Sequence, residues 1–157
     1  MNKFPLTTIL RHRKENLKKC SLRGLESRGD MQFFTYPKQS LPPLTSYILL
    51  DLNGPPLSIQ DAPYGLLLID GTWSHAQTMT ENLPQALSQS LILRSLPSHI
   101  KTAYPRRQTL CLDPDRGLAS IEALFIAYHI LGRNTEGLLD HYYWKDEFLS
   151  LNQLLTP

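Results

Sequence analysis

Residues 65–79, which read GLLLIDGTWSHAQTM, carry the pattern that decides the fold of this chain. The run 65–70 is apolar up to its final aspartate, which is typical of a strand buried on both faces of a parallel sheet. Gly71 then provides a turn, and Thr72 is suited to cap a helix that we expect over about 73–82. A strand, a turn and a helix in immediate succession predict an α/β fold.

Short strand-like and helix-like segments alternate on both sides of this unit. We expect strands over 7–12, 31–36, 47–52 and 91–96, and a short strand or an extended piece over 108–112. A helix or ordered loop is expected over 13–27, and helices over 117–131 and about 136–155. Because strands that alternate with helices pair in parallel, the pattern predicts an α/β domain with a mainly parallel sheet. No linker or internal repeat interrupts it, so residues 1–157 are expected to form a single domain.

The composition is that of a globular protein. The chain has 157 residues, of which 41% are hydrophobic and 19% charged, and a chain of this length can bury a substantial core. It has neither an apolar run long enough to span a membrane nor the apolar segment of a signal peptide. Its two cysteines are too few for a clustered zinc site. We therefore expect a cytoplasmic protein that contacts no membrane and holds no metal.

The positive charge is unevenly distributed along the chain. Residues 1–40 contain nine Lys and Arg against three acids, whereas the rest of the chain contains seven against eleven. Arg94, Lys101, Arg106 and Arg107 form a second basic stretch with no acid between them. Because basic segments attract phosphates by releasing counterions, these stretches are either solvated faces or contacts with an anionic partner such as RNA.

A candidate site lies where the apolar strand ends. Ligands of open α/β sheets bind beyond the carboxyl ends of the strands, and Asp70 is the last residue of this strand. The first amides of the next helix have no partner within the helix and attract negative charge. We expect Asp70, Thr72 and Trp73 to lie together at the mouth of a cleft. The alternative is that Asp70 caps the helix and Trp73 fills the core.

Three segments in the same order resemble a known family. Residues 70–73 (DGTW) resemble the D-x-T-W signature of the DTW-domain family. Residues 9–15 (ILRHRKE) are similar to its I-L-x-H-P-x-E segment, with Arg13 in place of the proline, and 118–123 (LASIEA) to its L-S-T-x-E-A motif. Residues 104–107 (YPRR) fall where members keep a tyrosine and arginines. The chain shows no counterpart of the zinc-knuckle-like segment with which many members begin.

A second, related family shares part of the pattern. Residues 18–21 (KKCS) look like the K-K-C-T segment of the Tsr3-like ribosomal RNA enzymes, which carry D-x-S-W. Both families resemble the SPOUT class, an α/β fold with a C-terminal trefoil knot. Both transfer the 3-amino-3-carboxypropyl group of S-adenosylmethionine to an RNA base, in the DTW family to N3 of a tRNA uridine. The resemblance implies a SPOUT-like fold, S-adenosylmethionine as cofactor and an RNA substrate, with tRNA preferred and rRNA as the alternative.

The resemblance also implies roles for the D-x-T-W side chains. The sulfonium of S-adenosylmethionine activates three adjacent carbons, and the carbon that lies in line with the nucleophile reacts. The flat ring of Trp73 is suited to cover the methyl group and to face the sulfonium charge. Asp70 either accepts the proton of uridine N3 as a general base or only orients the nucleobase.

The other site residues follow from the matched segments. Cofactor contacts are expected from Ser21, Thr72, Trp73, Leu96, Leu112, Leu118, Ser120 and Glu122, and RNA phosphate contacts from Arg11, Lys18, Lys19, Arg106 and Arg107. Glu122 has an alternative role, since an acid in the first turn of a helix can support the preceding loop. His12 and His75 are interpreted as structural residues.

Two other functions stay open at this point. An RNA methyltransferase of the same fold would differ only in the pose of the cofactor, and a non-catalytic RNA-binding module would need no cofactor. The intact Asp70, Thr72 and Trp73 favour an enzyme. The sequence does not specify the oligomeric state.

Overall fold

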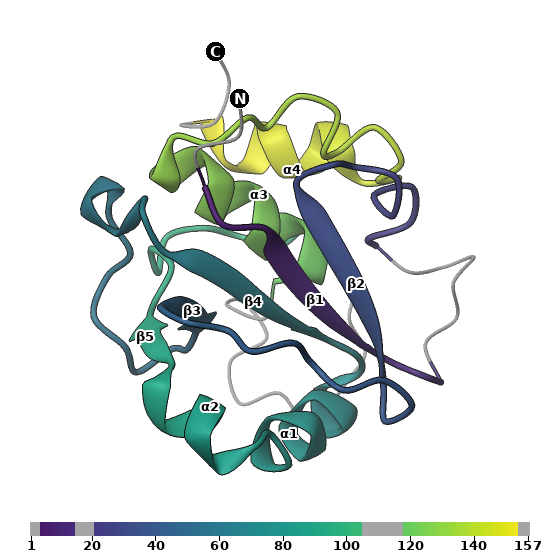
Figure 1. Ribbon diagram of the computed structural model, residues 1–157. Coiled ribbons are helices and arrows are strands. Elements are labelled where there is room, and N and C mark those ends of the chain that lie inside the picture. Colours follow the sequence, from purple (N-terminus) through teal and green to yellow (C-terminus); the bar gives the residue numbers. More distant parts are fainter. Residues whose placement is uncertain (1–3, 15–20, 105–117, 154–157) are drawn as a thin grey trace.

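A five-stranded parallel sheet forms the centre of the protein. The computed structural model describes residues 4–14, 21–104 and 118–153. The strands are β1 (Thr7–His12), β2 (Met31–Tyr36), β3 (Tyr47–Leu50), β4 (Gly65–Asp70) and β5 (Ile92–Arg94), in the spatial order β2-β1-β4-β3-β5. Every neighbouring pair runs parallel (Figure 1), so the predicted parallel sheet of an α/β fold is confirmed.

Helices cover both faces of this sheet (Figure 1). One face carries α1 (Trp73–Glu81) and α2 (Gln85–Ser90), and the other carries α3 (Ser120–Leu131) and α4 (Lys145–Leu151). A single turn of 3-10 helix, η1 (Ile59–Asp61), precedes β4. The protein is therefore built in three layers, with the sheet in the middle.

Strand β4 is buried on both faces, as its apolar run predicts. Leu66 and Leu68 pack into the apolar cluster beneath α3, whereas Leu67 and Ile69 pack into the cluster beneath α1. Successive side chains of a strand point to opposite faces, so a strand covered on both sides needs an apolar residue at every position. This explains why the run is continuous rather than alternating.

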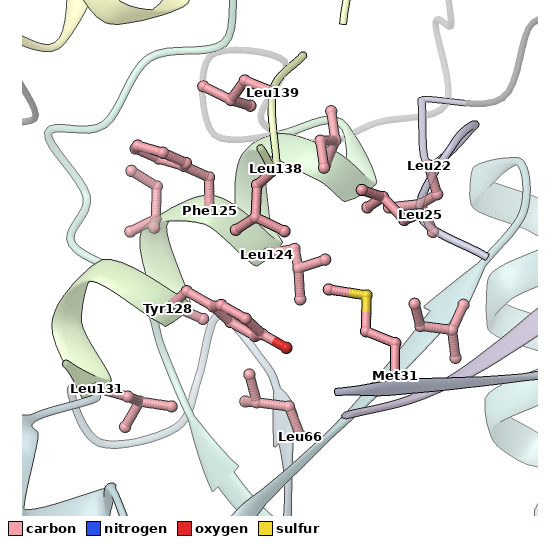
Figure 2. Packing of buried hydrophobic residues seen from close by; sticks show 14 of the residues in the cluster. Leu22, Leu25, Met31, Leu66, Leu124, Phe125, Tyr128, Leu131, Leu138 and Leu139 are labelled. Carbon is pink, nitrogen blue, oxygen red and sulfur yellow. The ribbon is translucent and has the colours of Figure 1, made fainter. Parts of the chain in front are cut away.

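The larger core lies between α3 and the sheet. Figure 2 shows Leu124 and Tyr128 of α3 on the side of the helix that faces Met31 of β2 and Leu66 of β4. Most of α3 is buried, and it ends at Gly132, whose φ of 72° lies in the left-handed region that terminates helices. The predicted end of this helix is confirmed, while its start lies at Ser120 rather than at residue 117. A firmly packed α3 holds its first turn in a fixed place at the sheet.

The C-terminal region differs from the expected single helix over 136–155. Residues 136–144 form turns, and within the described residues 136–153 the α-helix is confined to α4. Gly137 has a φ of 81°, a conformation that interrupts a helix, and Leu138, Leu139 and Tyr142 reach the core from the turns instead. The prediction of one long helix was wrong because a series of turns can bury apolar residues at this spacing as well as a helix can.

Several smaller differences concern the ends of elements and the loops. The described parts of 13–27 contain turns, which fits the ordered-loop alternative, whereas β3 and β5 are shorter than expected. Helix α2 was not expected from the sequence, because it is exposed and has no apolar stripe. The expected strand 108–112 and the trefoil knot depend on 105–117, which lie outside the described residues, so both stay predictions. No helix in the described ranges is both long enough and apolar enough to cross a membrane.

Candidate functional site

The candidate site lies at the carboxyl edge of the sheet, where β1 and β4 end side by side. Arg11 of β1 is paired in register with Asp70, the last residue of β4. The Nε of Arg11 donates a hydrogen bond to Oδ2 of Asp70 at 3.4 Å, and both side chains are buried. The strand pairing thus gives the predicted strand-end aspartate an arginine as its partner.

Ser120 holds the other oxygen of Asp70. It is the first residue of α3, and its Oγ donates to Oδ1 of Asp70 at 2.8 Å. Asp70 is only 3% exposed, so its carboxylate joins the ends of β1 and β4 to the start of α3 inside the protein. Because each carboxylate oxygen accepts from a different element, the orientation of the group is fixed.

Arg11 is held by a second carboxylate as well. Its Nη1 donates to Oε2 of Glu26 at 3.1 Å, and its guanidinium lies 4.9 Å from the centre of the Phe33 ring. Burial would raise the pKa of Glu26, but hydrogen bonds from the backbone and from Arg11 outweigh burial and lower this pKa below its usual value. A buried guanidinium between two carboxylates is poorly placed for a phosphate at the surface, and the phosphate contact expected from Arg11 stays a prediction.

The turn after β4 leads directly into α1. Thr72 caps this helix as predicted, since its hydroxyl accepts from the backbone amide of His75 at 3.4 Å. Trp73 is the first residue of α1, one position after the cap. The side chain of Trp73 lies outside what the structure describes, so its contact with the cofactor stays a prediction.

Ser21 also meets the start of α3. Its Oγ accepts a hydrogen bond from the amide of Ile121 at 3.2 Å, and so satisfies one of the first-turn amides that have no acceptor within the helix. A separation of 100 residues lies between these two partners, and 50 residues separate Asp70 from Ser120. The fold therefore gathers three predicted site residues, Ser21, Asp70 and Ser120, around the first turn of α3.

Glu122 supports the loop that approaches this helix. Its buried carboxylate accepts hydrogen bonds from the Thr102 hydroxyl at 2.5 Å, the amides of Ala103 and Ala119 at 2.8 Å each, and the Tyr142 hydroxyl at 2.9 Å. Such a saturated carboxylate fits the loop-supporting alternative for Glu122. A direct contact between Glu122 and the cofactor stays a prediction.

The remaining predicted residues divide into two groups. Leu96, two positions beyond β5, and Leu118, two positions before α3, are both half-buried against the core beneath α3. Both thus lie near elements that end or begin at the carboxyl edge. Leu112, Lys18, Lys19, Arg106 and Arg107 lie outside the described residues, and their predicted contacts stay predictions.

Two histidines that the sequence suggested were structural form a stacked pair beside Asp70. The ring of His12, at the end of β1, and that of His75, in the first turn of α1, are 3.9 Å apart and within 5° of parallel. The pKa of His12 is lowered, first by burial and further by the charges of His75, Arg13 and Lys14. Knowing that β1 pairs with β4 would have suggested this contact, but the strand order cannot be read from the local pattern.

The described residues contain no cluster of three His, Cys, Asp or Glu side chains that could bind a metal ion.

The chain is similar to a solved structure, the SAM-dependent rRNA:acp-transferase Tsr3 from Vulcanisaeta distributa. The TM-score is 0.70 and the sequence identity 25%, and the match covers 96% of this chain and 79% of that chain. No protein-family model and no curated protein matches the chain, so the resemblance to the DTW-domain family rests on its motifs alone.

Proposed function

We propose that this protein transfers the 3-amino-3-carboxypropyl group of S-adenosylmethionine to a base of an RNA substrate. The observation that carries the proposal is the likeness to the rRNA:acp-transferase Tsr3, which extends over 96% of the chain. The position of residues 70–73 (DGTW) supports it, because they follow the central strand at the edge where α/β sheets bind ligands.

The residues at the start of α3 suit the charged amino-acid arm of this cofactor. Ser21 and Ser120 bring two hydroxyls to the first turn of a well-packed helix, where amides and the helix dipole favour a carboxylate. The half-buried side chains of Leu96 and Leu118 offer apolar contacts for the adenosine. We therefore assign the cofactor to the carboxyl edge between α1 and α3.

The protein has to select which carbon of the cofactor faces the RNA. S-adenosylmethionine supplies a sulfonium that makes three neighbouring carbons electrophilic, so the selection depends on position alone. The cap at Thr72 fixes the start of α1 and hence the place of the Trp73 backbone at the mouth of the site. We assign to Trp73 the covering of the methyl group, which would leave the amino-acid arm to react.

We assign to Asp70 a positioning role rather than that of a general base. A base has to reach the proton that it removes, whereas Asp70 is 3% exposed and both of its oxygens accept hydrogen bonds from the protein. Its carboxylate holds Arg11 and Ser120, and through them the walls of the cofactor site. A pH–rate profile separates the roles, because loss of a base removes a limb of the profile and loss of a positioning residue keeps its shape.

Two RNA substrates each have one observation in their favour. Thr72 in the D-x-T-W motif favours N3 of a uridine in tRNA, because the related ribosomal RNA enzymes carry serine at this position. The likeness to an rRNA:acp-transferase favours rRNA. The two candidates share the reaction and differ only in the RNA that reaches the site.

The by-product of the reaction tests the proposal. Transfer of the amino-acid arm leaves 5′-methylthioadenosine, methyl transfer leaves S-adenosylhomocysteine, and a binding module leaves neither. Purified protein is incubated with S-adenosylmethionine and either unmodified tRNA or unmodified rRNA, and the by-products and the RNA nucleosides are analysed by mass spectrometry. We expect methylthioadenosine together with an aminocarboxypropylated nucleoside in one of the two RNAs. S-adenosylhomocysteine as the RNA-dependent by-product would contradict the proposal.

A further inference from the structure

Three aromatic rings line up beside the candidate site, and we call them the aromatic row. Tyr36 ends β2, His12 ends β1 and His75 lies in the first turn of α1. The centres of the Tyr36 and His12 rings are 5.8 Å apart, and those of His12 and His75 are 3.9 Å apart. All three side chains are half-buried, so the row presents part of its surface at the carboxyl edge.

Hydrogen bonds hold the row in place. The Tyr36 hydroxyl accepts from Nδ2 of Asn82 at the end of α1, at 3.1 Å. The Nδ1 of His12 accepts from the amide of Lys14, also at 3.1 Å, and the amide of His75 is bound by the Thr72 cap. Rings held by their own neighbours form a preorganised surface, which reduces the entropy lost when a ligand stacks on them.

Gly71 leaves room for the stack. A Cβ at position 71 would lie 3.2 Å from Cβ of His75 and 3.3 Å from Cβ of His12. Any side chain there would press on the bases of both imidazoles and alter their distance. The variable position of the D-x-T-W motif is thus occupied, in this chain, by the one residue that leaves the two rings undisturbed.

Exposed cations surround the row. Arg13 and Lys14 directly follow His12, and Lys38 lies two positions after Tyr36, and all three are exposed. The neighbouring acids Asp70 and Glu26 are both bound to Arg11. The pKa of His12 is lowered, first by burial, so at neutral pH its ring is flat and uncharged. Flat aromatic rings next to surface cations are the combination that single-stranded nucleic acids recognise, through base stacking and phosphate contacts.

We propose that the aromatic row stacks unpaired bases of the RNA substrate that adjoin the nucleotide to be modified. This inference rests on the proposed function for the identity of the ligand, and it adds that the target lies in a single-stranded segment. Base-paired RNA keeps its bases within the helix, whereas unpaired bases can be splayed onto aromatic side chains. Arg13 and Lys14 contact the phosphates of the same segment.

The test separates bases from phosphates with two probes of equal length. One is a fluorescent oligouridylate dodecamer, and the other is its abasic counterpart, which keeps every phosphate and lacks the bases. His75→Leu removes the ring, whereas His75→Phe keeps a flat ring without nitrogens. We expect His75→Leu to bind the oligouridylate roughly 5- to 150-fold more weakly, as stacking energies of about 1–3 kcal/mol per base imply, with the abasic probe unaffected. His75→Phe should bind both probes nearly as the wild type does.

Two control variants sharpen this comparison. Tyr143→Leu removes an 86% exposed aromatic residue next to α4, on the other side of the sheet. The affinity of this variant for both probes should equal that of the wild type. Arg13→Gln combined with Lys14→Gln should weaken the binding of both probes alike. The slope of log affinity against log salt concentration should become shallower by about 1.4, the value for two phosphate contacts on a single strand.

Two results would overturn the aromatic row as a stacking surface. The first is a His75→Leu protein that binds the oligouridylate as tightly as the wild type. The second is a His75→Phe protein that loses as much affinity as His75→Leu, which would indicate a contact made by the imidazole nitrogens. A separate assay of methylthioadenosine release reports on the proposed function. If no aminocarboxypropyl transfer occurs but binding still depends on the bases and on the ring at 75, the row is supported and the proposed function fails.

Discussion

The two edges of the sheet contain similar ion pairs between an arginine and an aspartate but use them differently. At the carboxyl edge, Asp70 binds Arg11 and Ser120. At the amino edge, Asp30 forms a two-point ion pair with Arg28, with distances of 2.9 Å from Nε to Oδ1 and 3.0 Å from Nη2 to Oδ2. A carboxylate paired with an arginine is therefore present at both ends of the strands, and only its surroundings can indicate a site.

At the amino edge, the hydrogen bonds of the ion pair extend to backbone carbonyls. Arg28 also donates to the carbonyls of Asn134 and Glu136, which follow α3. Burial raises the pKa of Tyr128 to about 12, so its hydroxyl keeps its proton, and it is hydrogen-bonded to Thr7 at 2.7 Å and to Asp30 at 3.3 Å. These groups connect the starts of β1 and β2 to α3 and to the loop behind it, which is a structural task.

The carboxyl edge instead combines its network with groups that are suited to contact a ligand. The starts of two helices, the half-buried aromatic row and exposed cations all lie beside Asp70. The comparison teaches that a buried ion pair is weak evidence for function by itself, and that its position relative to the strand ends and helix starts carries the information. Variants that change one edge and leave the other intact test whether the two edges differ in this way.

The largest effect is expected for Glu122→Gln. An amide nitrogen in place of one carboxylate oxygen would face donors that now bind that oxygen, and each buried donor left without an acceptor costs about 1–3 kcal/mol, so we expect a loss of about 4 kcal/mol in the free energy of unfolding. Urea denaturation measures this loss. The matched control Glu136→Gln changes an exposed carboxylate and should alter stability by no more than about 0.5 kcal/mol. Equal effects of the two variants would show that Glu122 does not support the loop.

A direct contrast of the two edges comes from Asp70→Asn and Asp30→Asn. Asp70→Asn leaves the buried Arg11 with only Glu26 as a charged partner in the observed ion pairs, and should cost about 3 kcal/mol of stability. Asp30→Asn should cost only about 1 kcal/mol, because Arg28 is more exposed and keeps two carbonyl acceptors.

Cofactor binding and pH dependence then distinguish the two aspartates. Calorimetry with S-adenosylmethionine should show weaker binding for Asp70→Asn and unchanged binding for Asp30→Asn. The pH–rate profile of Asp70→Asn should keep the shape of the wild-type profile at a lower rate. A drop of roughly 10²–10⁴ in turnover with unchanged cofactor affinity and a missing acidic limb, where the rate falls as a base takes up its proton, would instead make Asp70 the general base.

The local parts of the fold and site could be predicted from the sequence. A continuous apolar run, an aspartate and a threonine cap specify β4 and the start of α1 within a few residues, so Asp70 and Thr72 could be placed at the sheet edge. The long C-terminal helix could not be predicted correctly, because the left-handed conformation of Gly137 is favourable for glycine but is not required by it.

The partners of Asp70 required information that the local pattern lacks. The order β2-β1-β4-β3-β5 puts β1 beside β4, and only this pairing turns Arg11 from a surface cation into the partner of a buried carboxylate. The same pairing brings His12 against His75. For Glu122, the loop-supporting alternative could be formulated from its place in the first turn, but its four donors come from three separate stretches of chain.

A smaller effect, confined to the amino edge, is expected for Tyr128→Phe. The change removes the hydroxyl that binds Thr7 and Asp30 and leaves the ring in the core, so the free energy of unfolding should fall by about 1 kcal/mol. Cofactor affinity and the rate of aminocarboxypropyl transfer should stay at the wild-type values. Thr7 lies at the start of β1, whereas Arg11 and His12 lie at its other end, beside the candidate site. A loss of activity larger than the loss of stability would show that the two edges are coupled through α3.

The smallest effect concerns the pH dependence of stability at the carboxyl edge. The pKa of His12 in the folded protein lies below its ordinary value of 6.5, first because of burial and then because of neighbouring positive charge. The unfolded chain therefore binds the proton more readily, so the contribution of neutral His12 is complete above about pH 6.5 and is lost as the pH falls through the lower folded pKa.

The matched variant for this effect is His12→Asn, whose side-chain oxygen can still accept from the amide of Lys14. Between about pH 7.5 and pH 5.5, the urea midpoint of the wild type should fall more than that of His12→Asn, because only the wild type carries the imidazole with the lowered pKa. The lower limit stays above the range in which Glu26 and Asp30 titrate, since the pKa values of both carboxyls are lowered. Midpoints that fall in parallel would mean that His12 takes up its proton as easily in the folded protein as in the unfolded chain.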